Sequence, residues 1–212
     1  MNIENKLQSE IQSTIELYLN GRVNEALEKS KGLIATLPKE AVLFNIRGAC
    51  YAKLNKIDVA IDNYNKAILI NPNYAEAHNN LGITLNEIGQ FNNAVQCYRR
   101  ALAIKPNYSE AYNNLGNAFG ANNNLTEAIN SYEKALEINP QFSDAFSNLI
   151  QILKKTNELD ISIKSFKRII KIKPDFVEAY LSLGLAEMSN NQIDDAVSNF
   201  KKAIEYQDDC VK

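Results

Sequence analysis

The sequence predicts an all-α protein built from repeated helical hairpins, and two kinds of spacing support this. The five prolines, Pro38, Pro72, Pro106, Pro140 and Pro174, stand 34 residues apart. Because proline fixes φ and lacks a backbone N–H, a break that recurs at one interval indicates a copied structural unit. Between the breaks, apolar residues recur at helical spacing, as they do from Phe91 to Ile104. The chain is therefore predicted to be an array.

The chain divides into six windows of 34 residues, each with the proline position near its end. They are 7–40, 41–74, 75–108, 109–142, 143–176 and 177–210, and together they form a single array over residues 1–212. Stacked hairpins of this kind bury their apolar faces only against their neighbours.

Two repeat positions predict where the helices of each hairpin end and begin. Position 15 carries residue types that tolerate the left-handed conformation that closes a helix: Gly21, Asn55, Gly89, Asn123, Asn157 and Asn191. Position 18 carries residue types that cap a helix start: Asn24, Asp58, Asn92, Thr126, Asp160 and Asp194. We expect a first helix to end at position 15 and a second helix to be capped by position 18.

Three pairs of residues after the prolines are spaced like capping boxes, in which a cap and an acid three residues later satisfy each other's N–H groups. These pairs are Asn73 with Glu76, Asn107 with Glu110 and Asp175 with Glu178. They predict the start of the first helix of each hairpin.

Small residues recur where the two helices of a hairpin should meet. They are Gly82, Gly116 and Gly184 on the first helix, and Ala60, Ala94, Ala128 and Ala196 on the second. Small side chains let helix axes approach to ~8–10 Å. A larger side chain at these positions should force the helices apart.

The window 75–108 carries Leu81-Gly82, Leu85, Ala94, Tyr98 and Pro106 in one phase, and the next window repeats the pattern. This pattern resembles the tetratricopeptide repeat over nearly the whole chain. The resemblance implies a tetratricopeptide-repeat solenoid of about six helix-turn-helix hairpins that form a right-handed superhelix.

Two windows depart from that family pattern. The fifth has Ile150 for the glycine, and Ser162 and Ile169 for the two alanines. The first has Ser13-Thr14 in place of Leu-Gly. We expect these two hairpins to pack less regularly than the others.

Composition excludes several classes of protein. The formal net charge is −2, so the basic excess of a general nucleic-acid binder is missing. The three cysteines, Cys50, Cys97 and Cys210, form no CxxC pair, which favours small apolar residues in a reducing compartment over a disulfide scaffold or a zinc site. No apolar run approaches the ~20 residues of a membrane helix. The sequence predicts a cytoplasmic protein with no membrane or nucleic-acid partner.

No sequence motif of an enzyme or a cofactor site is present. There is no GxGxxG, GxxxxGK[ST], HExxH or GxSxG. The one histidine, His78, has neither a second histidine nor a cysteine pair to act with, so we interpret it as a packed or rim residue. We expect no catalytic residue, no cofactor and no metal.

In tetratricopeptide arrays, as the resemblance implies, the first helices line a concave groove through repeat positions 2, 5, 6, 9, 12 and 13. In this sequence those positions include seven asparagines: Asn45, Asn79, Asn80, Asn113, Asn114, Asn117 and Asn148. An asparagine amide can pair with both the N–H and the C=O of an extended peptide. The cluster partly resembles the asparagine ladder in the repeat arm of O-linked N-acetylglucosamine transferases. The alternative is drift of the repeat consensus in an asparagine-rich protein.

The groove positions also carry charge. Position 2 holds an acidic row, Glu76, Glu110, Asp144 and Glu178, which favourable charge at helix N-termini also explains. The carboxylate clamp of chaperone-binding tetratricopeptide domains needs lysine at positions 2 and 5, and this sequence has none there. We therefore do not expect a partner that is recognised by its terminal carboxylate.

These observations predict a non-catalytic scaffold that binds an extended peptide or a partner domain in its concave groove. The alternative is a substrate-recruiting arm of a larger enzyme, with a glycosyltransferase, sulfotransferase or methyltransferase domain beyond residue 212. The sequence favours a longer natural protein, because Asp208 stands where a sixth proline is expected and no further helix covers the last hairpin. Self-association through that uncapped hairpin is the third possibility.

Overall fold

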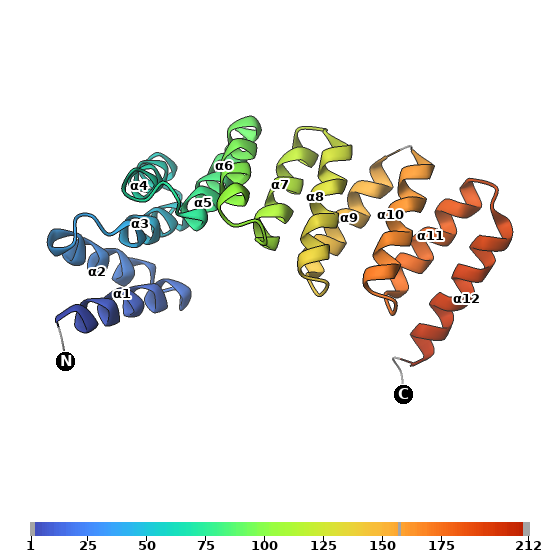
Figure 1. Ribbon diagram of the computed structural model, residues 1–212, viewed down its shortest axis with the longest axis horizontal. Helices are drawn as coiled ribbons and strands as arrows, with labels where there is room; N and C mark the ends of the chain where they lie inside the picture. The colour runs from blue at the N-terminus through green and yellow to red at the C-terminus, as the bar shows by residue number, and fades with distance from the viewer. Residues whose placement is uncertain (1–2, 157, 210–212) are drawn as a thin grey trace. The chain divides into compact units, whose positions relative to one another are not determined.

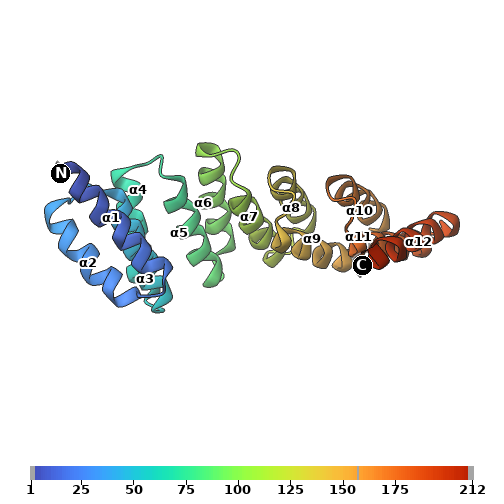
Figure 2. The ribbon, with the colours of Figure 1, turned by 90° about the horizontal axis from the view of Figure 1, so that it is seen from below.

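The computed structural model describes residues 3–156 and 158–209, which form twelve α-helices and no strand (Figures 1 and 2). The helices are α1 (Ile3–Leu19), α2 (Val23–Thr36), α3 (Ala41–Lys53), α4 (Ile57–Ile70), α5 (Ala75–Glu87), α6 (Phe91–Ile104), α7 (Ser109–Ala121), α8 (Leu125–Ile138), α9 (Ser143–Lys155), α10 (Leu159–Ile172), α11 (Val177–Ser189) and α12 (Ile193–Asp209). The predicted all-α class is confirmed.

Consecutive helices pair into six hairpins, which we number from hairpin 1 (α1 and α2) to hairpin 6 (α11 and α12). Each proline follows a second helix, as Pro72 follows the end of α4 at Ile70. The predicted breaks between hairpins are therefore confirmed. Helix α12 continues through Asp208, where a sixth proline would fall.

The predicted left-handed residues close the first helices. Asn55, Asn123 and Asn191 have φ of 56°, 59° and 61°, and Gly21 and Gly89 have φ of 76° and 77°. This confirms the prediction for five of the six positions, while Asn157 lies outside the described residues.

The hydrogen bonds after each left-handed residue form a Schellman motif, which satisfies the last carbonyl groups of the helix. In hairpin 3, the Gly89 N–H donates to Asn86 O at 3.0 Å and the Gln90 N–H donates to Leu85 O at 2.9 Å. Hairpins 1, 2, 4 and 6 repeat this pair of bonds. In hairpin 5, the C-cap Thr156 is instead extended, with φ −76° and ψ 139°.

The predicted caps of the second helices are wrong by two residues. These helices begin at position 17, as α4 does at Ile57, so the N-cap is position 16 and the expected cap, position 18, lies inside the helix. No side-chain cap bond is present at the starts of α2, α4, α6, α8 or α10. The reason is the Schellman turn, which leaves only one residue between the left-handed residue and the next helix. The acids at position 18, such as Asp58, then stabilise the helix through their favourable interaction with the helix dipole.

The predicted capping boxes are also absent. The N-caps of α5, α7 and α11 are Tyr74, Tyr108 and Phe176, and none of the three makes a side-chain cap bond. Asn73, Asn107 and Asp175 therefore precede the N-cap and cannot close a box with Glu76, Glu110 and Glu178. The turn after Pro72 is held by Asn71 instead, whose Oδ1 accepts from the Asn73 N–H at 3.1 Å.

The close approach of the two helices within a hairpin depends on a glycine that faces an aromatic ring. A Cβ at Gly82 would lie 2.6 Å from a ring carbon of Tyr98, and at Gly116 it would lie 2.5 Å from Tyr132. Gly48 meets Tyr64, and Gly184 meets Phe200, in the same way. The alanines at position 20, Ala60, Ala94, Ala128 and Ala196, are all buried. The predicted role of these small residues is confirmed.

Hairpins 1 and 5 carry other residues at the glycine and aromatic positions. Hairpin 1 has Thr14 and Ser30, and hairpin 5 has Ile150 and Phe166, all four of them buried. In both hairpins the two helices approach each other less closely than in hairpins 2, 3, 4 and 6. The expectation that the first and fifth windows pack less regularly is therefore confirmed.

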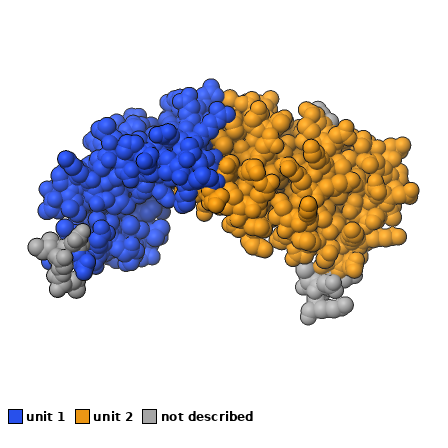
Figure 3. Space-filling view, viewed as in Figure 1, with its two compact units in different colours: residues 1–106 blue, residues 107–212 orange. Residues whose placement is uncertain are grey.

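The chain divides into two compact units, residues 1–106 and 107–212, coloured separately in Figure 3. In the first unit, α2 packs on α3 and α4 packs on α5. In the second, α8 packs on α9 and α10 packs on α11. Within each unit, the second helix of a hairpin is thus covered by the first helix of the next, which buries residues such as Leu43 in the first unit and Leu136 in the second.

Candidate functional site

The candidate site residues lie on the first helices of the hairpins. In the first unit, α3 contacts both α1 and α5, and in the second unit α7 contacts α9. We call the surface formed by repeat positions 2, 5, 6, 9, 12 and 13 of these helices the first-helix face of each unit. Each of the two faces is described separately.

The structure brings Asn45 and Asn80 together on the first-helix face of residues 1–106. Asn80 Nδ2 on α5 donates to Asn45 Oδ1 on α3 at 3.1 Å. Asn45 Nδ2 in turn donates to the Tyr74 hydroxyl at 3.3 Å. Asn79 is buried beside them on α5. These amides link the first helices of hairpins 2 and 3.

Asn113, Asn117 and Asn148 come together in the same way on the first-helix face of residues 107–212. Asn148 Nδ2 on α9 donates to Asn113 Oδ1 at 3.0 Å and to Asn117 Oδ1 at 3.1 Å. The Tyr132 hydroxyl donates to Asn117 Oδ1 at 2.9 Å, and burial raises the pKa of this tyrosine to about 12, which keeps the hydroxyl protonated. Asn114 is half-buried on α7.

The asparagine cluster therefore has a structural role that its sequence did not predict. Position 6 of one hairpin donates to position 5 of the preceding hairpin, both from Asn80 to Asn45 and from Asn148 to Asn113. Buried amides need such partners, because an unsatisfied one costs roughly 1–3 kcal/mol. The binding of a peptide by these asparagines stays a prediction.

A cavity of about 270 Å³ opens on the first-helix face of the first unit. Apart from Tyr64 on α4, its lining comes from three successive first helices and includes Tyr18, Lys53, Asn80, Ile83 and Glu87. Lys53 Nζ lies 4.6 Å from the centre of the Tyr18 ring, at cation–π distance. Burial raises the pKa of Tyr18, so its hydroxyl stays neutral. The cavity thus offers an aromatic ring, charges of both signs and an amide.

The acidic row at position 2 is partly neutralised within the protein. Glu76 Oε1 lies 3.2 Å from Lys105 Nζ, and Glu178 Oε1 lies 3.6 Å from Lys154 Nζ. These side chains are exposed, and exposed ion pairs contribute about 0–1 kcal/mol. A charged partner could therefore displace either pair at low cost.

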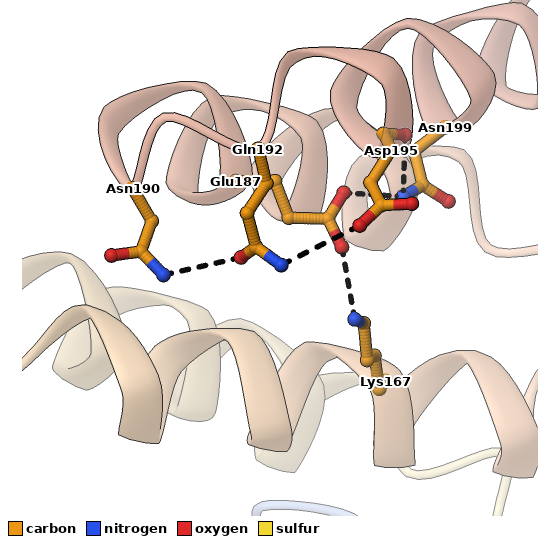
Figure 4. A network of polar contacts seen from close by, with 6 residues as sticks. All are labelled: Lys167, Glu187, Asn190, Gln192, Asp195 and Asn199. Carbon is orange, nitrogen blue, oxygen red and sulfur yellow. Dashed lines mark hydrogen bonds and ion pairs between the residues drawn. The ribbon is translucent and has the colours of Figure 1, made fainter.

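Sequence reasoning missed a buried carboxylate, Glu187 on α11 (Figure 4). Asn199 Nδ2 donates to its Oε2 at 2.6 Å, and Lys167 Nζ lies 3.1 Å from its Oε1, at ion-pair distance but without hydrogen-bond alignment. The network continues through Gln192, whose Nε2 donates to Asp195 Oδ2 at 3.4 Å. The signal was available in the sequence, because this repeat position holds an apolar or aromatic residue in the other hairpins: Leu17, Tyr51, Leu85, Phe119 and Leu153.

Hairpin 6 exposes large apolar side chains on both of its helices. On α12, Ile193, Val197 and Ile204 are exposed, whereas the counterparts of Val197 and Ile204 on α8, Ile129 and Leu136, are buried. The expected self-association concerns this surface of α12. It stays a prediction, which light scattering across a concentration series would test.

The remaining candidate residues that the structure describes are one histidine and two cysteines. His78 is buried, with Nε2 3.0 Å from the Pro72 carbonyl oxygen, as expected for a packed histidine. Burial raises the pKa of Cys50 and of Cys97 to about 11, so both thiols stay protonated at neutral pH. Cys210 lies outside the described residues. Across residues 3–156 and 158–209, no group of three or more His, Cys, Asp and Glu side chains could hold a metal ion.

Among the helices of the described residues, none is both long and apolar enough to cross a membrane.

The stacked hairpins with their glycine–aromatic contacts define a class of protein, the helical repeat proteins, and comparison with known families identifies the family. The family described as "TPR repeat" matches residues 48–87 and 84–123. "Tetratricopeptide repeat" descriptions match residues 109–142 and 177–210. The chain belongs to the tetratricopeptide repeat family.

Solved structures agree with this family. MamA is 31% identical over 77% of this chain and 96% of its own, with a TM-score of 0.57. The first tetratricopeptide repeat domain of Spaghetti, bound to the HSP90 peptide SRMEEVD, is 29% identical over 55% of this chain and 92% of its own, with a TM-score of 0.54. PilF of Pseudomonas aeruginosa shares the fold over 98% of both chains at 18% identity, with a TM-score of 0.71. No curated protein sequence matches this chain.

Proposed function

We propose that this chain is a non-catalytic protein-interaction scaffold whose first-helix faces bind an extended segment of a partner protein. The observation that carries the proposal is the cavity on the first unit, where Tyr18, Lys53 and Asn80 from three successive first helices line one space. Polar, aromatic and charged groups that converge in this way are typical of recognition sites. Binding, rather than catalysis, is the chemistry that such a surface can support.

The asparagine pairs would contribute to binding through their remaining hydrogen-bonding capacity. Each amide carries two N–H donors and an oxygen that can accept two bonds. Both bonds that Asn148 makes to its neighbours come from its amide nitrogen, so its oxygen is the atom that would accept from a peptide N–H. Because neighbouring helices already hold these side chains in place, little conformational entropy would be lost on binding.

A related domain supports a peptide as the partner, since the Spaghetti domain holds an HSP90 peptide. The present chain should not recognise a terminal carboxylate in the way that clamp-type domains do. Positions 2 and 5 of α5 are Glu76 and Asn79, where a clamp would need lysines. We therefore expect an internal peptide segment.

Site-specific photo-crosslinking tests this function. A photoreactive p-benzoylphenylalanine would replace Ala52 on α3 or Gln151 on α9, both on first-helix faces, and Lys66 on the second helix α4 would serve as the control. We expect crosslinks to partner polypeptides from the Ala52 and Gln151 sites and few from Lys66. Equal yields from all three sites would contradict the proposal.

A pair of substitutions extends the test to the asparagines. In the first unit, Asn80→Ala should lower the crosslink yield from the Ala52 site. In the second unit, Asn114→Ala should lower the yield from the Gln151 site, while circular dichroism shows that the helix content of both variants is retained. An unchanged yield would remove the asparagines from the proposed binding surface.

A further inference from the structure

The second unit contains a cleft of about 190 Å³ between α9, α10 and α11. Its apolar walls come from Leu153 on α9, Phe166 on α10 and Leu185 on α11, and Ser162, Ser182 and Ser189 also line it. Pockets for drug-sized ligands usually measure about 300–1,000 Å³. This cleft therefore has the size for one side chain of a partner and not for a whole small molecule.

The cleft lies where hairpin 5 departs from the repeat pattern. Ile150 and Phe166 are both large and both buried, and α9 and α10 approach each other less closely than the helices of hairpin 3. Phe166 also lines the cleft, so the residue that replaces the usual tyrosine forms part of its wall. The residues that depart from the repeat consensus thus lie beside a cleft that could bind a partner.

An exposed apolar stripe borders the cleft on α11. Leu181, Leu185 and Met188 have exposed fractions of 42%, 53% and 49%, and their spacing places them on one side of the helix. They occupy positions 5, 9 and 12 of the first-helix face, where α7 carries Asn113, Asn117 and Gly120. A group of large apolar side chains left in contact with water marks an interaction surface more often than single exposed residues do.

The charge at the cleft is positive. Lys154 is the one charged residue that lines it within the described chain, and the next residue, Lys155, is also exposed. Lys154 pairs with Glu178 at 3.6 Å, but both side chains are more than half exposed, so the pair is weak and replaceable. A carboxylate on a partner could form an ion pair with Lys154 in place of Glu178.

We propose that this cleft anchors a short internal segment of a partner protein, in which one bulky apolar side chain enters the cleft and an adjacent Asp or Glu pairs with Lys154. The inference rests on the proposed scaffold function and names the chemistry of the partner at one position of the second unit. The apolar wall supplies most of the affinity, because burial of a large apolar side chain contributes more than an exposed ion pair does. The lysine selects for the neighbouring acid.

Peptide display on the full chain tests the anchor. Random short peptides would be selected for binding, and we expect the selected sequences to share a Leu, Met or Phe next to an Asp or Glu. Leu185→Ser should weaken the selected peptides at least about tenfold, as expected for the loss of a buried leucine contact. The matched control is Leu69→Ser, which removes a leucine that is 81% exposed on α4.

A charge exchange tests the lysine separately. Lys154→Glu should weaken the selected acidic peptides, and replacing the acid by lysine in the same peptide should restore their binding to this variant. Lys66→Glu, on α4, is the control and should change neither.

The anchor proposal is overturned if no peptide is selected, if the selected peptides lack the acid or the apolar residue, or if they bind the Leu185→Ser chain unchanged. Crosslinks that persist at Ala52 and Gln151 under those outcomes would show that the scaffold function holds and that only the anchor is wrong. If the crosslinks at Ala52 and Gln151 are also lost, the scaffold function is rejected together with the anchor.

Discussion

Hairpins 3 and 5 have helices of equal length, 13 and 14 residues, and yet they pack differently. Hairpin 3 sets Gly82 against the Tyr98 ring, and its helices approach closely. Hairpin 5 carries Ile150 and Phe166 at the same two repeat positions, and its helices lie further apart beside a cleft with apolar walls. The residues at these two repeat positions thus distinguish a closely packed hairpin from one that lies beside a cleft for a partner side chain.

The largest expected effect comes from giving hairpin 3 the residue of hairpin 5. Gly82→Ile would place a branched side chain where even a Cβ lies 2.6 Å from Tyr98. Overpacking should lower the free energy of unfolding by about 3 kcal/mol, measured by urea denaturation. Gly32→Ala is the control, because a Cβ at Gly32 would meet no atom within 4 Å beyond the adjacent residues and backbone of its own helix, and helix propensity should raise the stability by about 0.5–1 kcal/mol. A loss of stability in the control or none in Gly82→Ile would contradict this account.

The next effect concerns the ion pair that ties hairpin 5 to hairpin 6. Glu187→Leu restores the apolar residue typical of that repeat position and removes a buried carboxylate next to Lys167. Lys167 is half exposed and stays in contact with water when its partner is removed, so the substitution removes the desolvation cost of the buried carboxylate without leaving a buried charge. We expect an unchanged or higher unfolding midpoint in urea. A clear decrease would mean that Glu187 contributes more than its desolvation costs.

The contribution of the asparagine hydrogen bonds to stability should also differ between the two hairpins, but by a smaller amount. Asn148 of hairpin 5 donates two hydrogen bonds to its neighbours, whereas Asn80 of hairpin 3 donates one to Asn45. Each bond contributes about 0.5–1.5 kcal/mol. Thermal unfolding should therefore show a larger decrease for Asn148→Ala than for Asn80→Ala. The reverse order would count against the structural role of these amides.

The last effect is a pH dependence of stability that hairpin 3 has and hairpin 5 lacks. Burial raises the pKa of Cys97 from 9.0 to about 11, while its counterpart in hairpin 5, Ser165, does not titrate in this range. Above pH 9 the unfolded chain loses the thiol proton that the folded chain keeps, so this stabilisation is lost between pH 9 and pH 11. Cys97→Ser should show a shallower decrease in stability over that range. Parallel curves for the two proteins would disagree with the expected shift.

Much of the fold could be predicted from the sequence, because the repeat places the same requirement at the same position six times. The left-handed turns at Asn55 and Gly89 and the glycine contact at Gly82 follow directly from residue type. The helix starts were harder to predict, because Asp58 and Asn73 belong to residue types that occur both at the N-cap and at positions next to the N-cap. The hydrogen bonds of the Schellman turn decided between these possibilities.

The candidate site was less predictable than the fold. The seven asparagines were found from their repeat positions, but their bonds to one another, such as the bond from Asn80 to Asn45, depend on the register between hairpins. The apolar stripe that contains Leu185 and Met188 became visible only with the exposure of each side chain. A sequence pattern shows which residues share a helix face, and it does not show which of them the neighbouring helix leaves uncovered.

We expect the large side chains of Ile150 and Phe166 to hold hairpin 5 open relative to hairpin 3. Spin labels at Lys155 and Lys164, and at the equivalent positions Glu87 and Gln96, would measure both hairpins by electron paramagnetic resonance in a chain without its native cysteines. All four residues are exposed. We predict a longer distance between the labels in hairpin 5 than in hairpin 3. Equal distances would contradict the account.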